Sequence, residues 1–434
     1  MAVLSTPPVA LYIHWPYCSR ICPYCDFNVT RARDHNPAQA DTQTALYEAI
    51  RADLRAQAQW LGPRRLASVF FGGGTPSLMR PEWVAQILED ARSLFPTDEA
   101  IEVTLEANPT DAEIARYRAF REAGINRLSI GIQSLKDESL RFLGRNHSAR
   151  EALNGLETAL SVFGRVSLDL IYALPDQTPE DWADELRQAA GLGVEHISPY
   201  QLTIESETAF GRAARRGQLR PPDPELAEIF YDTTQSVLND LSFEAYEVSN
   251  HARGVAARSQ HNINIWEGVD YIGVGPGAHG RLTLPHDFAE MAGQARQDAK
   301  EWAHGRLTLP HDFAEMAGQA RQDTKEWAQG RLTLNGARHA TVAEPNLKTY
   351  ISRVTETGHS VTPERLSAEE TLEEALMLGL RLIDGVRLER INGLPLQKRD
   401  ELIADGFLEQ TGTRLRATAK GRVVLDRLLL ELLS

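Results

Sequence analysis

The three cysteines of the chain lie within eight positions, in the segment Cys18-Ser-Arg-Ile-Cys22-Pro-Tyr-Cys25. An odd number of cysteines so close together does not predict a framework of disulfide bonds. Three thiolates on one short loop can instead face a single inorganic cluster, and thiolates are the ligands of iron–sulfur centres. The spacing therefore favours an iron–sulfur site.

Two other interpretations of this segment stay open from the residues alone. A zinc ion could take the three thiolates with His14 as its fourth ligand, although structural zinc sites usually draw on two separated pairs of ligands. The thiols could also be buried without any metal, but Pro16 and Pro23 within a polar loop are not typical of simple core packing.

Six short segments rich in β-branched and aromatic residues predict the scaffold that holds this loop. These predicted strands cover residues 9–15, 66–71, 101–106, 127–132, 166–174 and 196–204. Amphipathic helical segments such as residues 149–163 lie between them, and Thr178-Pro179 has the pattern of a helix start. The repeated βα units predict a parallel sheet with right-handed crossovers that curls toward a partial barrel.

Polar residues mark the ends of successive predicted strands. A glycine triplet that ends in Gly74 and is followed by Thr75 comes after the second strand, and Glu106 ends the third. Gln133 follows the fourth strand, and Asp169 lies in the fifth. Because the functional residues of an α/β barrel lie at the carboxyl ends of its strands, we expect these residues to face one mouth beside the cysteine loop.

The chemistry of these residues suits a small polar cofactor above a cluster. A glycine backbone can approach an amino-acid group and donate N–H groups, while Glu106 can pair with an ammonium and Arg145 with a carboxylate. Asp169 or Gln133 can bind ribose hydroxyls. Structural roles are equally open, with Glu106 as a solvated strand end, Arg145 as a surface charge on a helix and Asp169 as a buried acceptor.

A tandem duplication interrupts the second half of the chain. Residues 280–304 and 305–329 match at all but two positions, and a third copy starts at Gly330 before it diverges. Each unit has apolar residues at helical spacing, but two units are fewer than a stacked solenoid needs. We expect two helices that pack on each other as a surface insertion.

The C-terminal tail predicts a small domain. Helical patterns at 368–383 and 394–405, a β-like stretch at 408–417 and a last helix from Ala419 follow the order of a winged-helix module. The acidic surroundings favour a packing domain over one that reads DNA.

Composition argues against two classes of partner. With 60 acidic and 46 basic residues, the net charge of −14 repels phosphate backbones, so we expect no nucleic acid. No stretch approaches the roughly 20 apolar residues that a membrane-spanning helix needs. The first residues lack the pattern of a signal peptide, so we expect a cytoplasmic protein without a transmembrane segment.

Together, five motifs resemble one known family. They are HWPYCSRICPYCDF, GGGTPS, LEANP, GINRLSIGIQS and DLIYALP, which start at residues 14, 72, 105, 124 and 169. This set is similar to the radical-SAM family that contains oxygen-independent coproporphyrinogen III dehydrogenases and related haem chaperones. The resemblance covers residues 11–433 apart from the duplicated segment.

The resemblance implies a fold and a set of cofactors. It implies an α/β fold, a partial (βα)6 radical-SAM barrel with a C-terminal helical, winged-helix-like domain. It also implies a 4Fe-4S cluster on Cys18, Cys22 and Cys25, with S-adenosylmethionine on the remaining iron. By matching motifs, the contacts to S-adenosylmethionine fall on Tyr12, Tyr24, Gly74, Thr75, Glu106, Gln133, Arg145 and Asp169.

Departures from the dehydrogenase pattern favour a haem chaperone. The dehydrogenases continue with a further cysteine, whereas Asp26 and Phe27 follow Cys25 here and the chain has no fourth cysteine. The segment from His261 to Trp266 resembles the His-Asn-x-x-Tyr-Trp motif associated with haem binding in the chaperones, with Ile265 at the tyrosine position. His261 is thus the expected haem ligand.

Three functions follow from these features. The preferred one is a chaperone that binds the cluster, S-adenosylmethionine and haem and passes haem to an acceptor protein. The alternative is coproporphyrinogen III dehydrogenase activity, and a distant third is a zinc-stapled interaction protein. His251 and His279 are lesser candidates for the haem ligand.

The predicted organisation has three parts. Residues 1–245 form the radical-SAM partial barrel, and residues 366–434 form the winged-helix-like domain. Between them, residues 246–365 carry the haem or substrate pocket and the duplicated helical insertion at about 280–334.

Overall fold

The computed structural model describes residues 6–33, 36–97, 100–285 and 336–433. The helices predicted for the duplicated segment fall on residues 286–335 and lie outside this described part. Residues 280–285, with which the first copy begins, belong to a strand of the main sheet.

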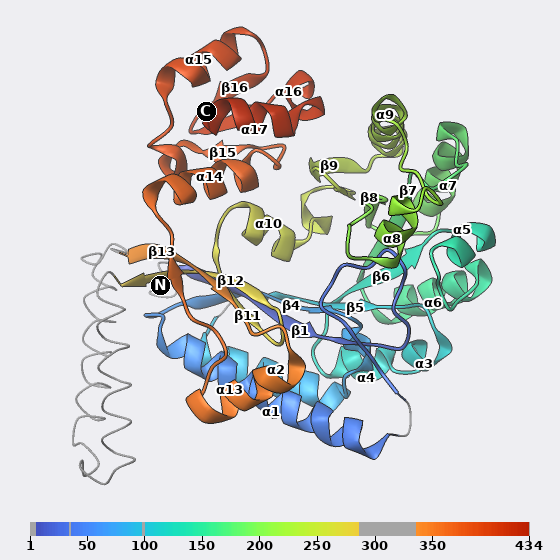
Figure 1. The fold of residues 1–434 in the computed structure, drawn as a ribbon, viewed down its shortest axis with the longest axis vertical. Helices are drawn as coiled ribbons and strands as arrows, with labels where there is room; N and C mark the ends of the chain where they lie inside the picture. The colour runs from blue at the N-terminus through green and yellow to red at the C-terminus, as the bar shows by residue number, and fades with distance from the viewer. Residues whose placement is uncertain (1–5, 34–35, 98–99, 286–335, 434) are drawn as a thin grey trace.

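Six parallel strands form the centre of a 12-stranded sheet (Figure 1). In spatial order they are β1 (Pro8–Trp15), β4 (Arg65–Gly73), β5 (Glu102–Ala107), β6 (Arg127–Gln133), β7 (Arg165–Tyr172) and β8 (His196–Gln201). Each corresponds to one predicted strand, and most ends differ by one or two residues. The predicted parallel arrangement is confirmed.

The sheet continues on both sides of these six strands. Next to β1 lie β11 (Asp270–Val274), β12 (His279–Pro285), β13 (Gly336–Val342) and β14 (Glu364–Arg365), of which β11 is parallel to β1 and the others pair antiparallel. Next to β8 lie β10 (Asn250–Ala252) and β9 (Glu244–Glu247). Strands from both sides of residue 245 thus share one sheet, and the predicted division at 245 stays a prediction.

Helices connect the successive parallel strands or follow the last of them. Most pack on the outer face of the sheet, whereas the helix of residues 209–215 contacts the cysteine loop through Phe210 and Pro23. They are α1 (Pro37–Gln59), α2 (Pro81–Leu94), α3 (Asp111–Ile114), α4 (Tyr117–Glu122), α5 (Asp137–Phe142), α6 (Ala149–Val162), α7 (Pro179–Ala190), α8 (Ala209–Arg215), α9 (Pro224–Asp240) and, after β13, α13 (Leu347–Thr357). The predicted start at Thr178 is confirmed, because its side chain accepts the N–H of Asp181 in a capping box.

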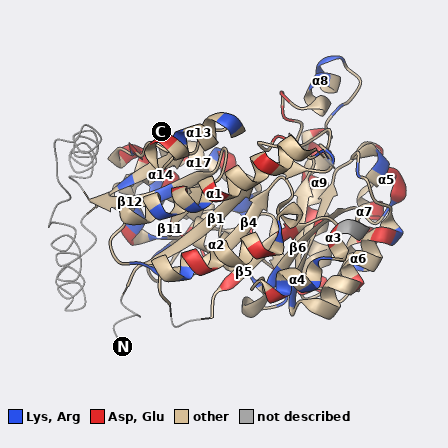
Figure 2. Cartoon of the chain, turned by 90° about the horizontal axis from the view of Figure 1, so that it is seen from below, with Lys and Arg blue, Asp and Glu red and all other residues tan. Residues whose placement is uncertain are grey.

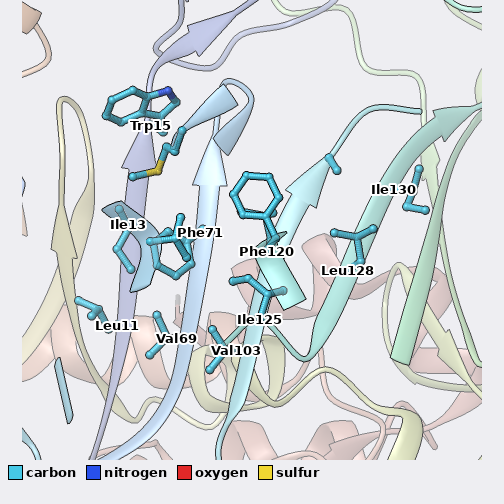
Figure 3. Close-up of a cluster of buried hydrophobic side chains, with 14 of the residues drawn as sticks. Leu11, Ile13, Trp15, Val69, Phe71, Val103, Phe120, Ile125, Leu128 and Ile130 are labelled. Carbon is cyan, nitrogen blue, oxygen red and sulfur yellow. The ribbon is translucent and has the colours of Figure 1, made fainter. Parts of the chain in front are cut away.

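The two faces of the parallel strands differ in chemistry. Leu11, Ile13 and Trp15 of β1 are buried on the outer face beside Val69 and Phe71 of β4 (Figure 3). Alternate residues of the same strands point to the opposite, inner face. The inner positions are largely polar, as described below, so the sheet holds an apolar layer on one side and a polar interior on the other.

The C-terminal domain has a core of its own. It consists of α14 (Ala368–Gly379), β15 (Val386–Arg387), α15 (Leu396–Ala404), β16 (Leu408–Thr411), β17 (Arg414–Ala417), α16 (Ala419–Val423) and α17 (Leu425–Leu433). The predicted order of helices and strand is present, but the β-like stretch is a hairpin of β16 and β17. The last helical segment is divided at Val424.

Surface charges of both signs are mixed over the described chain. In Figure 2, α5 carries acidic and basic side chains within one short helix. No helix of the described ranges is long and apolar enough to cross a membrane.

A buried carboxyl joins α13 to α1 and to the central sheet. Asp53 of α1 accepts hydrogen bonds from the hydroxyl of Tyr350 at 2.9 Å and from Ser360 at 3.2 Å. The Tyr350 hydroxyl also accepts the backbone N–H of Gly275 at 3.0 Å, directly after β11. Burial raises the pKa of Asp53 to about 6. The Tyr350 hydroxyl thus connects two helices of the outer layer to the central sheet.

We expect Tyr350→Phe to lower the free energy of unfolding by about 1–3 kcal/mol, because it leaves a buried carboxyl oxygen and a buried N–H short of a partner. Chemical denaturation measures the change. Thr355→Ala alters an exposed hydroxyl on the same helix and serves as the control. Equal stability of Tyr350→Phe and the unaltered protein would contradict this role.

Candidate functional site

The cysteine loop is held against the carboxyl end of β1. It starts in β2 (Tyr17–Cys18), which pairs with β3 (Thr30–Arg31), so the two ends of the loop are tied together. Cys18 is buried, whereas Cys22 and Cys25 are half-buried, and all three thiols are free. They line one cavity of about 530 Å³. This volume is typical of pockets for small molecules.

The strand ends supply the rest of the cavity wall. Of the residues assigned to S-adenosylmethionine by resemblance, the structure places these on the cavity: Tyr24, Gly74, Thr75, Glu106, Gln133, Arg145 and Asp169. Tyr24 belongs to the cysteine loop, and the others come from β5, β6, β7 and the segments that follow β4 and β6. The expected convergence on one mouth beside the cysteines is therefore present in the geometry, while the contacts themselves stay a prediction.

Gly74 is required by the cysteine loop itself. A Cβ atom at this position would lie 2.6 Å from the carbonyl oxygen of Pro16 and 2.8 Å from that of Tyr17. The N–H of Gly74 donates to the carbonyl of Trp15 at 2.8 Å. The glycine thus allows the end of β4 to pass directly beside the loop, which brings the neighbouring Thr75 side chain toward Cys18.

Arg145 connects the loop to the strands. Its Nη1 donates to the sulfur of Cys22 at 3.4 Å, and its Nη2 donates to the carbonyl of Gly131 at 2.7 Å and to the side chain of Asn108. These bonds fix the guanidinium beside the thiols. The positive charge lies where negatively charged thiolates would gather, and such a charge stabilises them.

The floor of the cavity is acidic. Burial, together with the nearby charge of Asp169, raises the pKa of Glu106 to about 8, against one backbone hydrogen bond from Gly73. Burial also raises the pKa of Asp169 to about 6, although Ser129 donates to both of its oxygens at 3.1 Å. Arg127 lowers the pKa of Asp169, but the burial of both carboxyl groups outweighs this effect. Two carboxyl groups buried close together favour a cationic ligand.

Burial of Cys18 and Cys25 favours the protonated form of these two thiols. Burial raises the pKa of Cys18 to about 11 and raises the pKa of Cys25 as well. Thiolate ligands must lose these protons, so binding of an iron cluster releases them and reverses the effect of burial.

His14, the proposed fourth ligand of a zinc ion, is engaged elsewhere. Its Nε2 lies 2.9 Å from the carbonyl oxygen of Asn28, and its Nδ1 lies 3.1 Å from the hydroxyl of Tyr12. Within the described ranges, no three or more histidine, cysteine or acidic side chains converge on a single metal position. The zinc interpretation gains nothing from this geometry.

Tyr12 and His261 do not line the cavity but lie next to each other on the inner face of the sheet. His261 belongs to α10 (Gln260–Trp266), and its ring stacks on Phe70 at 4.3 Å and on Tyr12 at 6.1 Å between centroids. Burial lowers the pKa of His261 to about 4, so the imidazole is neutral. Its Nδ1 is buried and has no hydrogen-bond partner in the described part of the chain.

The two lesser histidine candidates differ in position. His251 is buried in β10, where burial lowers its pKa to about 4, and His279 is exposed at the start of β12. Neither lines the cavity.

The sequence interpretation missed several cavity residues. They are Asn108, Ser129, Tyr200, Gln201 and Glu205, together with exposed residues of the cysteine loop. Tyr200 and Gln201 are the last two residues of β8, so the strand-end pattern that selects Glu106 also applies to them. Ser129 lies inside β6 between buried Leu128 and Ile130, where only the alternation of polar and apolar residues marks it.

Comparisons with known proteins identify two matching family models and several relatives of this chain. Residues 12–189 match the model of the radical SAM superfamily, and residues 366–424 match that of the HemN C-terminal domain. The mouse protein named radical S-adenosyl methionine domain-containing protein 1, mitochondrial, is 38% identical over 98% of this chain and 87% of its own length. This chain belongs to the radical SAM family.

Two further relatives and one solved structure are similar to most of this chain. The heme chaperone HemW of Mycobacterium tuberculosis is 30% identical over 100% of this chain and 97% of its own length, and HemW of Escherichia coli is 39% identical over 65% and 72%. The structure of coproporphyrinogen III oxidase (HemN) from Escherichia coli aligns with 99% of this chain and 92% of its own, with a TM-score of 0.71 and 19% identity. The last similarity confirms the fold alone.

Membership of the radical SAM family implies a 4Fe-4S cluster and S-adenosylmethionine, and the residues present fit both groups. Three thiols line one side of the cavity, the Arg145 charge lies beside them, and the acidic floor suits the ammonium and sulfonium of the nucleotide. When bound, such a cluster supplies an electron to S-adenosylmethionine. The chain itself supplies the ligands and the shape of the cavity.

We expect alanine at any one of Cys18, Cys22 or Cys25 to abolish cluster binding without loss of helix content, because the apolar core lies on the opposite face of the sheet (Figure 3). Iron and sulfide analysis of anaerobically reconstituted protein measures the first, and circular dichroism measures the second. Arg31→Ala, an exposed residue of β3, is the control. A full complement of iron and sulfide in all three cysteine variants would rule out this ligand set.

We expect binding of S-adenosylmethionine at pH 7 to release up to about one proton, because a cation beside Glu106 favours the carboxylate and lowers its raised pKa. Without a bound cation, Glu106 stays protonated in the folded protein up to about pH 8, whereas its ordinary pKa is 4.5. Its contribution to the stability of the ligand-free fold is therefore fully present below pH 4.5 and is lost as the pH rises through about 8. Calorimetry in buffers of different ionisation enthalpy measures the release.

The matched control for this experiment is Asp53→Asn, which removes another buried carboxyl far from the cavity and should keep the proton release. Glu106→Gln should remove it and weaken binding. Proton release that is unchanged in Glu106→Gln would show that a different group titrates.

Proposed function

We propose that this protein is a haem chaperone on a radical SAM scaffold, which binds a 4Fe-4S cluster, S-adenosylmethionine and haem and passes haem to an acceptor protein. Relatives named heme chaperone HemW support the proposal, one of them similar along almost its whole length. The Asp26-Phe27 sequence after Cys25, in place of a further cysteine, also supports it.

Within this proposal Cys18, Cys22 and Cys25 hold the cluster, and the cavity holds S-adenosylmethionine. Thr75 and the backbone beside Gly74 line the part of the wall nearest the cysteine loop. Glu106 neutralises the ammonium, and Asp169 or Gln133 binds the ribose. Arg145 already has several protein partners, so its role is to hold the thiol side of the cavity in place while it faces the carboxylate.

In this proposal His261 is the haem ligand. The neutral, partly unpaired imidazole ring is the observation that supports haem binding. A neutral imidazole is the form that ligates haem iron. The His261 side chain is neutral and half-buried beside the ring of Phe70. Its Nδ1 has no hydrogen-bond partner among the described residues. A buried polar atom without a partner costs folding free energy, which a purely structural histidine would avoid. Tyr12 contacts the same ring and feels the charge of Glu106, which lines the S-adenosylmethionine cavity.

Coproporphyrinogen III dehydrogenase activity is the second candidate. The similarity to coproporphyrinogen III oxidase extends along almost the whole chain, but at 19% identity it concerns the fold. The cytoplasm is the proposed compartment, although the mouse and bovine relatives carry the word mitochondrial in their names.

We expect anaerobically purified protein to bind haem with a saturable change of the Soret band, and His261→Ala to lower the affinity by about tenfold or more, because it removes an axial ligand. A haem titration followed by absorbance measures both. His359→Ala, a histidine against Trp60 on the outer layer, is the matched control.

A titration without saturable Soret change would exclude the chaperone function. Conversion of coproporphyrinogen III at catalytic turnover, under anaerobic conditions with reductant and S-adenosylmethionine, would replace it with the enzymatic alternative. Equal haem affinity of His261→Ala and unaltered protein would show that a different residue ligates the haem iron.

A further inference from the structure

The short helix that carries His261 is anchored to two parts of the molecule. In Figure 1, α10 lies between the central sheet and the C-terminal domain. On the sheet side, Asn264 donates to the hydroxyl of Ser68 in β4 at 2.9 Å. At the other end, Glu267 accepts hydrogen bonds from Arg414 at 2.6 Å and Arg387 at 3.3 Å, both of the C-terminal domain.

A buried carboxylate holds the first turn of this helix. Glu102 of β5 is only 5% exposed, and its Oε1 accepts the backbone N–H of Gln260 at 2.9 Å and that of His261 at 3.2 Å. The first N–H groups of a helix have no partner within the helix, so an acceptor here fixes the position of the turn. The backbone of His261 is therefore bonded directly to the sheet.

The negative charge of Glu102 is maintained by two arginines. Its Oε2 accepts a hydrogen bond from Arg165 at 2.7 Å and lies 3.9 Å from Arg127. Burial raises the pKa of this carboxyl, but the two arginines and the two N–H groups outweigh burial and hold the pKa below its ordinary value. An ionised acceptor with three hydrogen-bond donors and a second arginine around it cannot move without leaving buried groups unpaired.

The ring of His261 has no comparable anchor. Its contacts are the stacking on Phe70 and Tyr12, and its Nδ1 lacks a partner in the described part of the chain. A histidine that ligates a metal normally has its second ring nitrogen oriented by a hydrogen bond. Here the orientation must come from the backbone to which the ring is attached.

We propose that Glu102 is the positioning residue for His261, with Ser68 as a second anchor of the same helix. The inference rests on the proposed function, since it assigns Glu102 a part in haem ligation through His261. Glu102 does not line the cysteine cavity, so its part is separate from cluster and nucleotide binding.

The test is a haem titration of the full chain, purified anaerobically with its cluster. Glu102→Gln should weaken haem binding about tenfold and shift the Soret band toward that of His261→Ala, because a neutral amide holds the two N–H groups less firmly. Iron content and S-adenosylmethionine affinity should remain unchanged. Glu195→Gln is the matched control, because Glu195 also accepts a hydrogen bond from Arg165, at 2.9 Å, without a contact to α10.

A double variant separates positioning from a general loss of structure. If Glu102 acts through His261, then adding Glu102→Gln to His261→Ala produces no further loss of haem affinity. Additive losses in the double variant, or an equal loss in Glu195→Gln, would overturn the inference. If Glu102→Gln does not yield folded protein, Ser68→Ala decides: a few-fold loss of haem affinity supports the inference, and unchanged affinity overturns it.

The same titration distinguishes this inference from the proposed function. Haem binding that does not depend on His261 removes the role proposed for that residue and, with it, the role of Glu102. Haem binding that depends on His261 but is unaltered by Glu102→Gln overturns only the inference about Glu102.

Discussion

The two-sided character of the parallel strands is the constraint on which the site depends. In β1, Leu11, Ile13 and Trp15 pack under the helices, while Tyr12 and His14 between them face the interior. A shift of one residue in strand pairing would exchange the two sets. Burial of the apolar set against the helices therefore fixes the register, and the register in turn fixes which polar groups face the cavity.

The cysteine loop contributes little apolar packing and takes its position from the strands below it. Pairing of β2 with β3 closes the loop, the absence of a side chain at Gly74 admits it close to β4, and Arg145 bonds it to β6 through Gly131. The loop also contacts α8, where the N–H of Phe210 donates to the carbonyl of Pro23 at 2.9 Å. In this arrangement Cys18 is buried and Cys22 and Cys25 are half-buried, and all three line the cavity.

Sequence patterns located the part of the site that lies on regular strands. Glu106 is indicated by its place at the end of an apolar strand, Asp169 by its place among apolar residues within one, and the glycines before Thr75 by their place at a strand end. The strands from β9 to β14 are not among the predicted ones. Of these, β9, β10 and β14 have only two to four residues, which carry too little periodicity. β12 was also hidden, because its residues were assigned to a repeating helical unit.

The position of His261 depends on tertiary packing that no local pattern encodes. The motif around it indicated a ligand, but its stacking on Phe70 and its separation from the cysteine cavity arise from contacts across almost 200 positions of sequence. Glu102 stands at the beginning of its strand, so a pattern of polar residues at the carboxyl ends of strands does not select it.

The antiparallel pairing of β12 with β13 has an evolutionary consequence. Pro285 and Gly336 are register partners, so the two points at which the chain leaves and re-enters the described fold are neighbours on adjacent strands. The entropy of closing a connection between such points rises only slowly with its length. Gain or loss of whole repeats between these two points by unequal recombination therefore leaves the pairing of β12 with β13 in place. Near-identical copies can accumulate at such a location.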